Sequence, residues 1–253
     1  MKKVLIPLLL GLALIVAGCS SQTSQTPQTP DPTPEPAKPV EAYQGLGKSV
    51  NFRLGPGSDS EGVPVYSFNI VMADATFDNE GRIINAYVDA YEVSTPNYDG
   101  ASMPHFTGWP GADGYNFTDH ATAKVTGVVK NDEASAQAEV NGWKTKRERG
   151  ADYGMNWTEQ MDAYQEFFKG KTVDEIEAWI TKYTSDRNGR PLKADATDEQ
   201  DAAKYNGLSD TEKQDLAELT STATISLNDA HGNIVDALRS AYENRVKVTI
   251  PAE

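Results

Sequence analysis

The residues best suited to chemistry in this chain are the hydroxyl side chains between Leu219 and Ser226. The stretch reads Leu-Thr-Ser-Thr-Ala-Thr-Ile-Ser, and we expect a helix to begin just after it, near residues 227–229. A helix N-terminus carries unpaired backbone N–H groups and the positive end of the helix dipole, so it suits a phosphate. A threonine there can present its hydroxyl to that phosphate. The competing interpretation is structural: a short β-prone segment, Ala223–Leu227, followed by Ser/Thr helix caps.

Other catalytic or metal-binding motifs are missing from the sequence. It contains no HExxH, CxxC or GxSxG motif, no Walker loop and no GxGxxG. His105, His120 and His231 have no partner at metal-ligand spacing, and the acidic clusters lack the regular spacing of a calcium loop. The sequence therefore predicts no metal site, and it favours a carrier or binding protein over an enzyme with its own substrate turnover.

The N-terminus has the pattern of a bacterial lipoprotein signal. A basic start, Met1–Lys3, precedes the apolar run Val4–Val16, which is too short to span a bilayer as a helix. The run ends in Ile15-Val16-Ala17-Gly18-Cys19, which resembles the lipobox, in which the cysteine is diacylated. We therefore expect residues 1–18 to be a signal peptide and Cys19 to anchor the chain at the extracytoplasmic face of the cell membrane.

Charge and cysteine content narrow the function further. Cys19 is the only cysteine, so once it is lipidated no thiolate remains for catalysis or metal ligation. Cleavage removes Lys2 and Lys3 and no acid, which changes the net charge from −14 to about −14 − 2 = −16. Such a surface repels nucleic acid, which we exclude as a partner.

Composition divides the mature chain into a tether and a single domain. Residues 19–40 are rich in Pro, Thr and Gln and offer no large apolar side chain before Val40, which predicts a disordered, extended tether. Residues 41–253 are enough for one folded domain.

The first half of that domain is predicted to consist of strands. Residues 64–73 and 83–93 should form an antiparallel hairpin around the turn Phe77–Arg82, with Gly81 at its positive-φ position. Gly55-Pro56-Gly57 is interpreted as a simple turn. Residues 95–120, rich in Pro, Gly and aromatic side chains, should be a long ordered loop that is either functional or packs over an edge of the core.

The second half is predicted to be helical, which gives an α+β fold. Trp157, Met161, Tyr164 and Phe168 recur at helical spacing, and Gly170 should end that helix. Capping boxes at 172–175 and 209–212 predict two more helices, separated by a polar loop over 185–207. The next helix of this half should carry an apolar stripe, and the chain should close on the strand 246–250. The stripe consists of Ile234, Val235, Leu238, Ala241 and Tyr242.

Taken together, the segment Ser221–Ser226 and the hairpin around Gly81 resemble the FMN-binding domain family. The hallmark of that family is a Ser-Gly-Ala-Thr-x-Ser/Thr stretch, whose threonine can be esterified to the FMN phosphate by a flavin transferase. The resemblance extends over residues 142–146 and 170–176. It points to the lipoprotein branch of the family, some of whose members are pheromone-precursor lipoproteins and others extracellular electron-transfer lipoproteins.

The resemblance implies a flavin site on four residues of this chain. Ser221, Ala223, Thr224 and Ser226 match the hallmark and would bind FMN, covalently or not, with Thr224 bonded to its phosphate. A flavin transferase and a membrane redox donor are the implied partners. Thr222 stands where the family has glycine, and its β-branched side chain would hinder close approach of the backbone to the flavin.

The sequence therefore leads to a surface-anchored flavin-binding lipoprotein that relays electrons outside the cell. One alternative is a lipoprotein of the same fold that binds another small ligand and no flavin. Another is a pheromone precursor that releases the peptide Leu12–Gly18 from its signal sequence.

Overall fold

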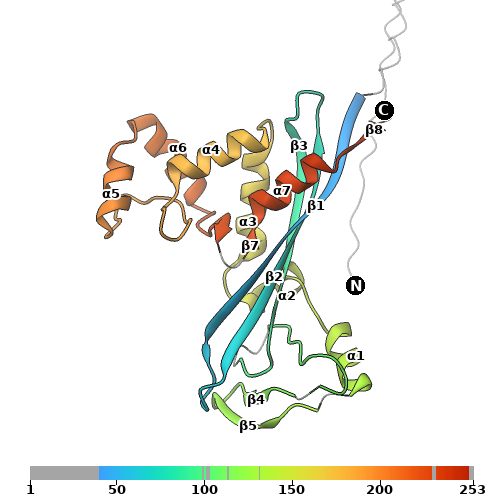
Figure 1. Cartoon of the computed structure of the whole chain (residues 1–253). Coiled ribbons are helices and arrows are strands. Elements are labelled where there is room, and N and C mark those ends of the chain that lie inside the picture. Colours follow the sequence, from blue (N-terminus) through green and yellow to red (C-terminus); the bar gives the residue numbers. More distant parts are fainter. Residues whose placement is uncertain are drawn as a thin grey trace, which may run out of the picture. The chain divides into compact units, whose positions relative to one another are not determined.

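The computed structural model describes residues 40–98, 100, 103–112, 114–130, 132–229 and 232–250. The expected signal peptide with its Leu12–Gly18 peptide, the lipidated Cys19 and the tether lie outside this range, apart from the backbone of Val40. The described residues combine strands in the first half with helices in the second, so the expected α+β single domain is confirmed (Figure 1).

One antiparallel sheet holds the domain together, with the strand order β3-β2-β1-β8. The predicted hairpin is present as β2 (Pro64–Phe77) and β3 (Ile83–Ser94). Gly81 has φ +80°, as the turn requires, and the Asp78 carboxylate accepts the backbone N–H groups of Glu80 and Arg82. The predicted C-terminal strand is β8 (Val246–Ile250), which pairs with the start of β1 (Val40–Ser58).

The long strand β1 was missed as a strand, and the prediction of a simple turn at Gly55-Pro56-Gly57 is wrong. Residues 43–54 pair without interruption with β2, and only past Leu54 does the register shift. Gly55 and Gly57 take positive φ values of +126° and +75°, which place them in an irregularity of the β1–β2 ladder.

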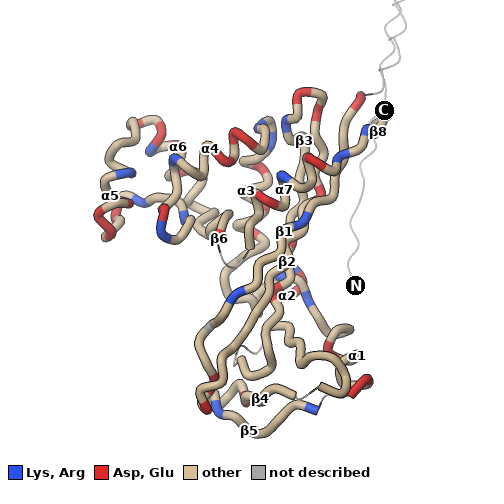
Figure 2. The backbone as a smooth tube through the Cα atoms, in the orientation of Figure 1, with Lys and Arg blue, Asp and Glu red and all other residues tan. Residues whose placement is uncertain are grey.

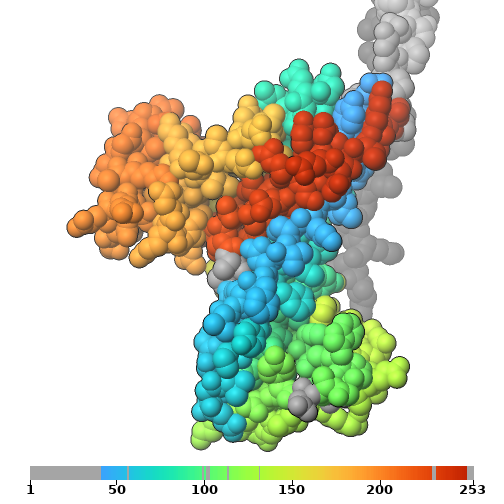
Figure 3. Space-filling view, in the orientation of Figure 1, coloured from blue at the N-terminus to red at the C-terminus, as the bar shows by residue number. Residues whose placement is uncertain are grey.

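Helix α7 (Ile234–Glu243) covers one face of the sheet (Figure 3). It lies so close to β1 that a Cβ on Gly47 would stand 2.1 Å from the carbonyl oxygen of Ala237. The predicted apolar stripe of this helix is confirmed: Ile234, Val235, Leu238 and Ala241 are buried, and Tyr242 is partly buried against the core. Glycine at position 47 is thus required for the helix to rest directly on the sheet.

Helices α3 (Trp157–Phe168) and α4 (Val173–Tyr183) complete the core on this face. All four aromatic and methionine positions predicted for α3 are buried, and the chain leaves the helix through Gly170 at φ +75°. The capping boxes predicted at Thr172 and Ser209 are both present, the second at the start of α6 (Asp210–Thr220).

The prediction of an unbroken polar loop over 185–207 is wrong, because α5 (Glu199–Asn206) lies inside it. Asp198 caps this helix by accepting the backbone N–H groups of Gln200 and Asp201. Its sequence has a weak apolar stripe and no buried residue, so the periodicity signal for a helix was missing.

The opposite face of the sheet is covered in part by the loop that follows β3. This loop ends in β4 (Asn116–Asp119), which pairs with β5 (Lys124–Val128). The prediction of a loop over the whole of residues 95–120 is therefore wrong for residues 116–119, which form a strand. Helices α1 (Glu133–Asn141) and α2 (Lys146–Arg149) and the 3-10 turn η1 (Gly150–Tyr153) then lead back to α3.

Charge is unevenly distributed over these elements. Acidic and basic residues recur along α3 to α7 (Figure 2), whereas the sequence of the loop between β3 and β4 has only Asp99 and Asp113 as charged residues. Within the described residues, no helix combines the length and the apolar character needed to cross a membrane.

Candidate functional site: a cationic and aromatic pocket beside α3

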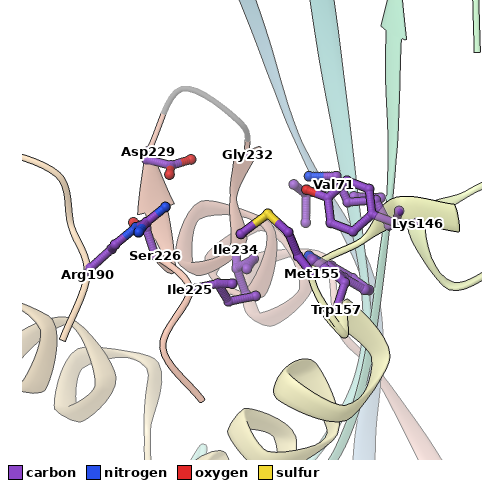
Figure 4. Close-up of a pocket in the computed structure, with 12 residues that line it drawn as sticks. Val71, Lys146, Met155, Trp157, Arg190, Ile225, Ser226, Asp229, Gly232 and Ile234 are labelled. Atoms are coloured by element: carbon purple, nitrogen blue, oxygen red, sulfur yellow. The ribbon is translucent and has the colours of Figure 1, made fainter. Parts of the chain in front are cut away.

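A pocket opens where the loops before α3 and α7 meet the sheet (Figure 4). Its enclosed volume is about 130 Å³. Two cations, two aromatic rings and the segment predicted to bind flavin contribute to its walls. The lining residues are Val71, Ala90, Lys146, Tyr153, Met155, Trp157, Arg190, Ile225, Ser226, Asp229, Gly232 and Ile234.

Helix α3 positions the predicted segment through the amide of Gln160, a buried side chain. The Gln160 Oε1 atom accepts the backbone N–H groups of Thr224 (2.7 Å) and Ile225 (2.9 Å) and the hydroxyl of Thr224 (3.2 Å). One turn later, the Tyr164 hydroxyl donates to the carbonyl oxygen of Ile225 at 2.8 Å. Burial raises the pKa of Tyr164, which keeps it a neutral donor.

Gln160 also holds the opposite wall of the pocket. Its Nε2 atom donates to the carbonyl oxygen of Met155 at 2.6 Å. The next residue, Asn156, takes a left-handed conformation at φ +47°, which is unusual for a residue other than glycine. The side-chain amide of Gln160 therefore links the loop that carries Met155 to the loop that carries Ile225 through hydrogen bonds.

Two expectations about this segment are wrong. Helix α7 begins at Ile234, not near residues 227–229, and its cap is Asn233, whose side chain accepts the backbone N–H of Asp236. The chain between them forms a small ladder of β6 (Asn228–Asp229) and β7 (Gly232–Asn233), and Ala223–Leu227 is not a strand. The hydroxyl-rich segment thus precedes a hairpin, and the helix N-terminus lies farther along the chain.

The structure separates the four residues matched to the family hallmark. Ser226 lines the pocket, whereas Ala223 is fully buried in the core. Thr224 is partly buried, with its hydroxyl on Gln160, and Ser221 is exposed at the end of α6, where its hydroxyl donates to the carbonyl oxygen of Glu218. Ile225, the variable position of the hallmark, also lines the pocket.

Thr222 lies on the exposed turn that follows α6 and is not part of the pocket lining. Its backbone N–H donates to the carbonyl oxygen of Leu219 at 3.3 Å. Among the described residues other than glycine, only Ala123 and Asn156 have positive φ. The backbone at position 222 therefore needs no glycine in this structure, and the side chain of Thr222 does not narrow the pocket.

Lys146 provides a buried positive charge at the pocket wall. Its side chain is only 4% exposed, and its Nζ atom lies 3.8 Å from the equally buried Glu92 carboxylate. The same ammonium lies 5.1 Å from the ring centroid of Tyr153 and 6.0 Å from that of Trp157. The two rings and the Glu92 carboxylate thus lie around this ammonium.

Other residues of α2 fix this wall against the sheet. The Arg147 guanidinium donates to the carbonyl oxygen of Val88 and lies over the rings of Tyr87 (4.7 Å) and Trp157 (5.6 Å). Arg149 is buried; desolvation lowers the pKa of its guanidinium, and the nearby Glu92 opposes this shift. The pocket therefore lies beside a group of cations in a chain whose net charge is −14.

Arg190 reaches the pocket from a turn that fits closely against the predicted segment. A Cβ on Gly189, which has φ +67°, would stand 2.3 Å from the hydroxyl oxygen of Ser226. The Asn188 side chain accepts the backbone N–H of Arg190, and the carbonyl oxygen of Arg190 accepts the N–H of Ser185. This turn brings an exposed guanidinium next to Ser226, on the side of the pocket away from Lys146 (Figure 4).

Sequence reasoning missed the polar residues that define this pocket, namely Lys146, Gln160 and Arg190. Lys146 lies in one of the segments that carry the family resemblance, which was the available signal. Gln160 lies on an amphipathic helix and Arg190 in a polar turn, and neither position has a motif of its own. Within the described residues, no group of three or more His, Cys, Asp or Glu side chains is placed to hold a metal ion.

Comparison with known proteins gives one informative match. A chlorophenol reductase of Desulfitobacterium hafniense is 33% identical over 218 residues, which cover 81% of this chain and 59% of that protein. This chain thus spans less than two thirds of the length of that relative. No protein-family model matches the sequence, and no solved structure matches it.

Proposed function

We propose that this chain is an FMN-binding lipoprotein, anchored through Cys19 at the extracytoplasmic face of the membrane, that relays electrons. The observation that carries the proposal is the position of the family hallmark in the fold. Ile225 and Ser226 form one wall of a pocket whose other walls provide two cations and two aromatic rings. These are the groups that a phosphorylated, planar cofactor needs.

The residues present fit FMN in chemistry. Arg190 and Ser226 offer a guanidinium and a hydroxyl to the phosphate, and the turn at Gly189 holds them together. Trp157 and Tyr153 offer aromatic surface to the isoalloxazine ring, with Lys146 beside it. The enclosed volume of about 130 Å³ is below the ~300–1,000 Å³ of typical ligand sites, so part of FMN would lie in the open mouth.

Bound FMN supplies reversible one- and two-electron transfer, while the protein sets its position and surroundings. Gln160 and Tyr164 fix the backbone of Thr224 and Ile225, so the segment is held in place before any ligand binds. The name of the relative describes a redox enzyme, which agrees with a redox role here. We carry over that general class and not its substrate.

Discrimination between FMN and riboflavin tests the proposal, since only FMN has the phosphate. Purified mature protein should bind FMN more tightly than riboflavin in a titration followed by flavin fluorescence. Arg190→Gln should weaken FMN binding roughly tenfold and leave riboflavin binding unchanged. Arg187→Gln is the matched control, because Arg187 lies on the same turn and its side chain is 72% exposed outside the pocket.

A second measurement addresses the covalent form. Intact mass after co-expression with a flavin transferase should reveal one FMN adduct, which Thr224→Val should abolish without changing circular dichroism. If neither flavin binds and no adduct forms, the flavin proposal fails. If an adduct forms on Ser226 instead, the covalent bond is made by the pocket-lining hydroxyl and the prediction of an ester at Thr224 fails.

A further inference from the structure

A second, larger cavity lies on the other face of the sheet, where β1 and β2 meet the loop that follows β3. Its volume is about 500 Å³, which falls in the range of small-molecule sites. Strand and loop residues line it together: Phe52, Tyr66, Ser67, Phe68, Val93, Ser94, Thr95, Phe106, Gly108 and Tyr115. We refer to it as the aromatic cleft.

The lining of the aromatic cleft is neutral and rich in rings. Five of its side chains are aromatic, and none of the described residues that line it is charged. Phe52 is 71% exposed and stacks on Tyr66 with ring centroids 5.8 Å apart. In a chain of net charge −14, a neutral aromatic surface of this kind selects an uncharged ligand with a flat apolar face.

The cleft is preformed, because its walls are fixed from behind by Trp143. The Trp143 ring contacts Phe68 and Phe106 at centroid distances of 6.1 Å each, and its indole N–H donates to the carbonyl oxygen of His105 at 2.8 Å. Glu139 of α1 accepts the backbone N–H of Thr107 at 2.9 Å. These contacts hold the loop against the sheet without any ligand.

We propose that the aromatic cleft binds a neutral, planar aromatic molecule of two or three fused rings with carbonyl oxygens on its rim, the chemistry of a quinone. The rings of Phe52, Phe68 and Phe106 provide the stacking surface. The phenols of Tyr66 and Tyr115 have no hydrogen-bond partner among the described residues, and they supply donors for carbonyl oxygens. This proposal does not rest on flavin binding.

The test uses the mature protein and 1,4-naphthoquinone, with naphthalene as the probe that lacks oxygen, in calorimetric titrations. Phe52→Ala should weaken binding of both probes roughly three- to tenfold, because a stacking partner is lost. Tyr66→Phe should weaken only the quinone, by a similar factor. Leu46→Ala is the matched control: Leu46 is 70% exposed on the same strand and lies outside the cleft.

Four outcomes would overturn the proposal. Absence of binding is the first, and an equal effect of Leu46→Ala and Phe52→Ala is the second. The third is concentration-dependent dimerisation in sedimentation that Phe52→Ala abolishes, which would make the cleft an interface between two copies. Arg190→Gln, which leaves the cleft intact, should not alter quinone binding. Loss of quinone binding in that variant would place the ligand in the other pocket and also refute the proposal.

Discussion

The pocket beside α3 and the aromatic cleft draw on the same two strands, and their apolar strand residues, Val71 and Ala90 for the pocket and Phe68 and Val93 for the cleft, lie on opposite faces. Strand β2 contributes Val71 to the pocket and Phe68 to the cleft, and β3 contributes Ala90 and Val93 respectively. Because successive side chains of a strand point to opposite faces, residues three apart cannot share a face. The two cavities therefore share a backbone scaffold (Figure 1) while their lining side chains are separate.

The two cavities differ in charge and in the elements that cover them. The pocket has Lys146, Arg190 and Asp229 in its walls and is framed by helices and short hairpins. The cleft is covered by a loop, and the described residues that line it carry no charge. A single hairpin can thus present a polar surface and an apolar surface without mixing them. It follows that variants of one cavity should leave the other intact, and this separation can be tested.

The largest effect is expected for Gln160→Leu, which keeps the size of the side chain and removes the hydrogen bonds of the Gln160 amide to the two loops. The backbone N–H groups of Thr224 and Ile225 would lose their acceptor, and we expect a destabilisation of about 2–4 kcal/mol. FMN binding should be lost and naphthoquinone binding retained. Chemical denaturation and both titrations measure this, with the exposed Gln214→Leu on α6 as control. Retained FMN affinity would show that the hydrogen bonds of Gln160 do not shape the pocket.

Trp143→Ala should have the opposite effect on the two ligands, abolishing naphthoquinone binding and leaving FMN binding intact. Removing the ring takes away the support of Phe68 and Phe106 and a hydrogen bond to the loop, for which we expect a loss of about 2 kcal/mol. Naphthoquinone binding should disappear while FMN binding persists. Trp109→Ala is the comparison of the same residue type: Trp109 is 76% exposed in the same loop and packs edge-to-face on Phe106 (5.5 Å), so its removal should reduce naphthoquinone binding less than the loss of Trp143. If both ligands are lost together, the two cavities are coupled through the sheet.

His105 should make the stability of the loop over the cleft depend on pH. Burial, with a smaller contribution from His120, lowers the pKa of His105 from 6.5 to about 4. Between these values the unfolded chain binds the proton more readily, so stability should fall as pH drops from about 6.5 to about 4 and level off below. The expected loss is on the order of 1 kcal/mol, because the ring is partly exposed.

Denaturation curves at pH 7, 5.5 and 4 measure this dependence. His105→Phe should abolish it, whereas His120→Gln should retain most of it, because desolvation is the main cause of the shift. Hydrogen exchange should assign the loss to the loop after β3 and leave the α3 pocket unchanged. An unchanged pH profile in His105→Phe would show that another group titrates.

The smallest effect is expected for Thr222→Gly, which introduces the glycine of the FMN-binding hallmark that this segment resembles. The side chain is exposed and the backbone has ordinary dihedral angles, so stability should change by no more than about 0.5 kcal/mol. FMN affinity should also stay the same, because Thr222 is outside the pocket lining. A marked gain in FMN adduct with a flavin transferase would show that the enzyme, and not the pocket, requires glycine here.

The helices and strands that were predicted correctly are those whose signals lie between residues close together in the sequence, whereas those that depend on distant contacts were missed. Periodicity located α3 and α7, and capping boxes located the starts of α4 and α6, because these signals lie within a few residues of one another. The strand β1 was missed because its stretch with Gly45 and Gly47 is suited to a helix packed on it, a contact with residues about two hundred positions away. Helix α5 was missed because it has no buried face.

By itself, the sequence determined the α+β class, the β2–β3 hairpin and the amphipathic helices, and it singled out the hydroxyl-rich segment Ser221–Ser226, for which we propose a flavin site. Only the tertiary structure decided which residues of that segment face a pocket. Gln160 and Tyr164 turn Ile225 and Ser226 toward Lys146 and Arg190, and Ala223 into the core. The physical reason is that hydrogen-bond pairing and burial join residues distant in the chain, whereas a local pattern specifies residue types and not their directions.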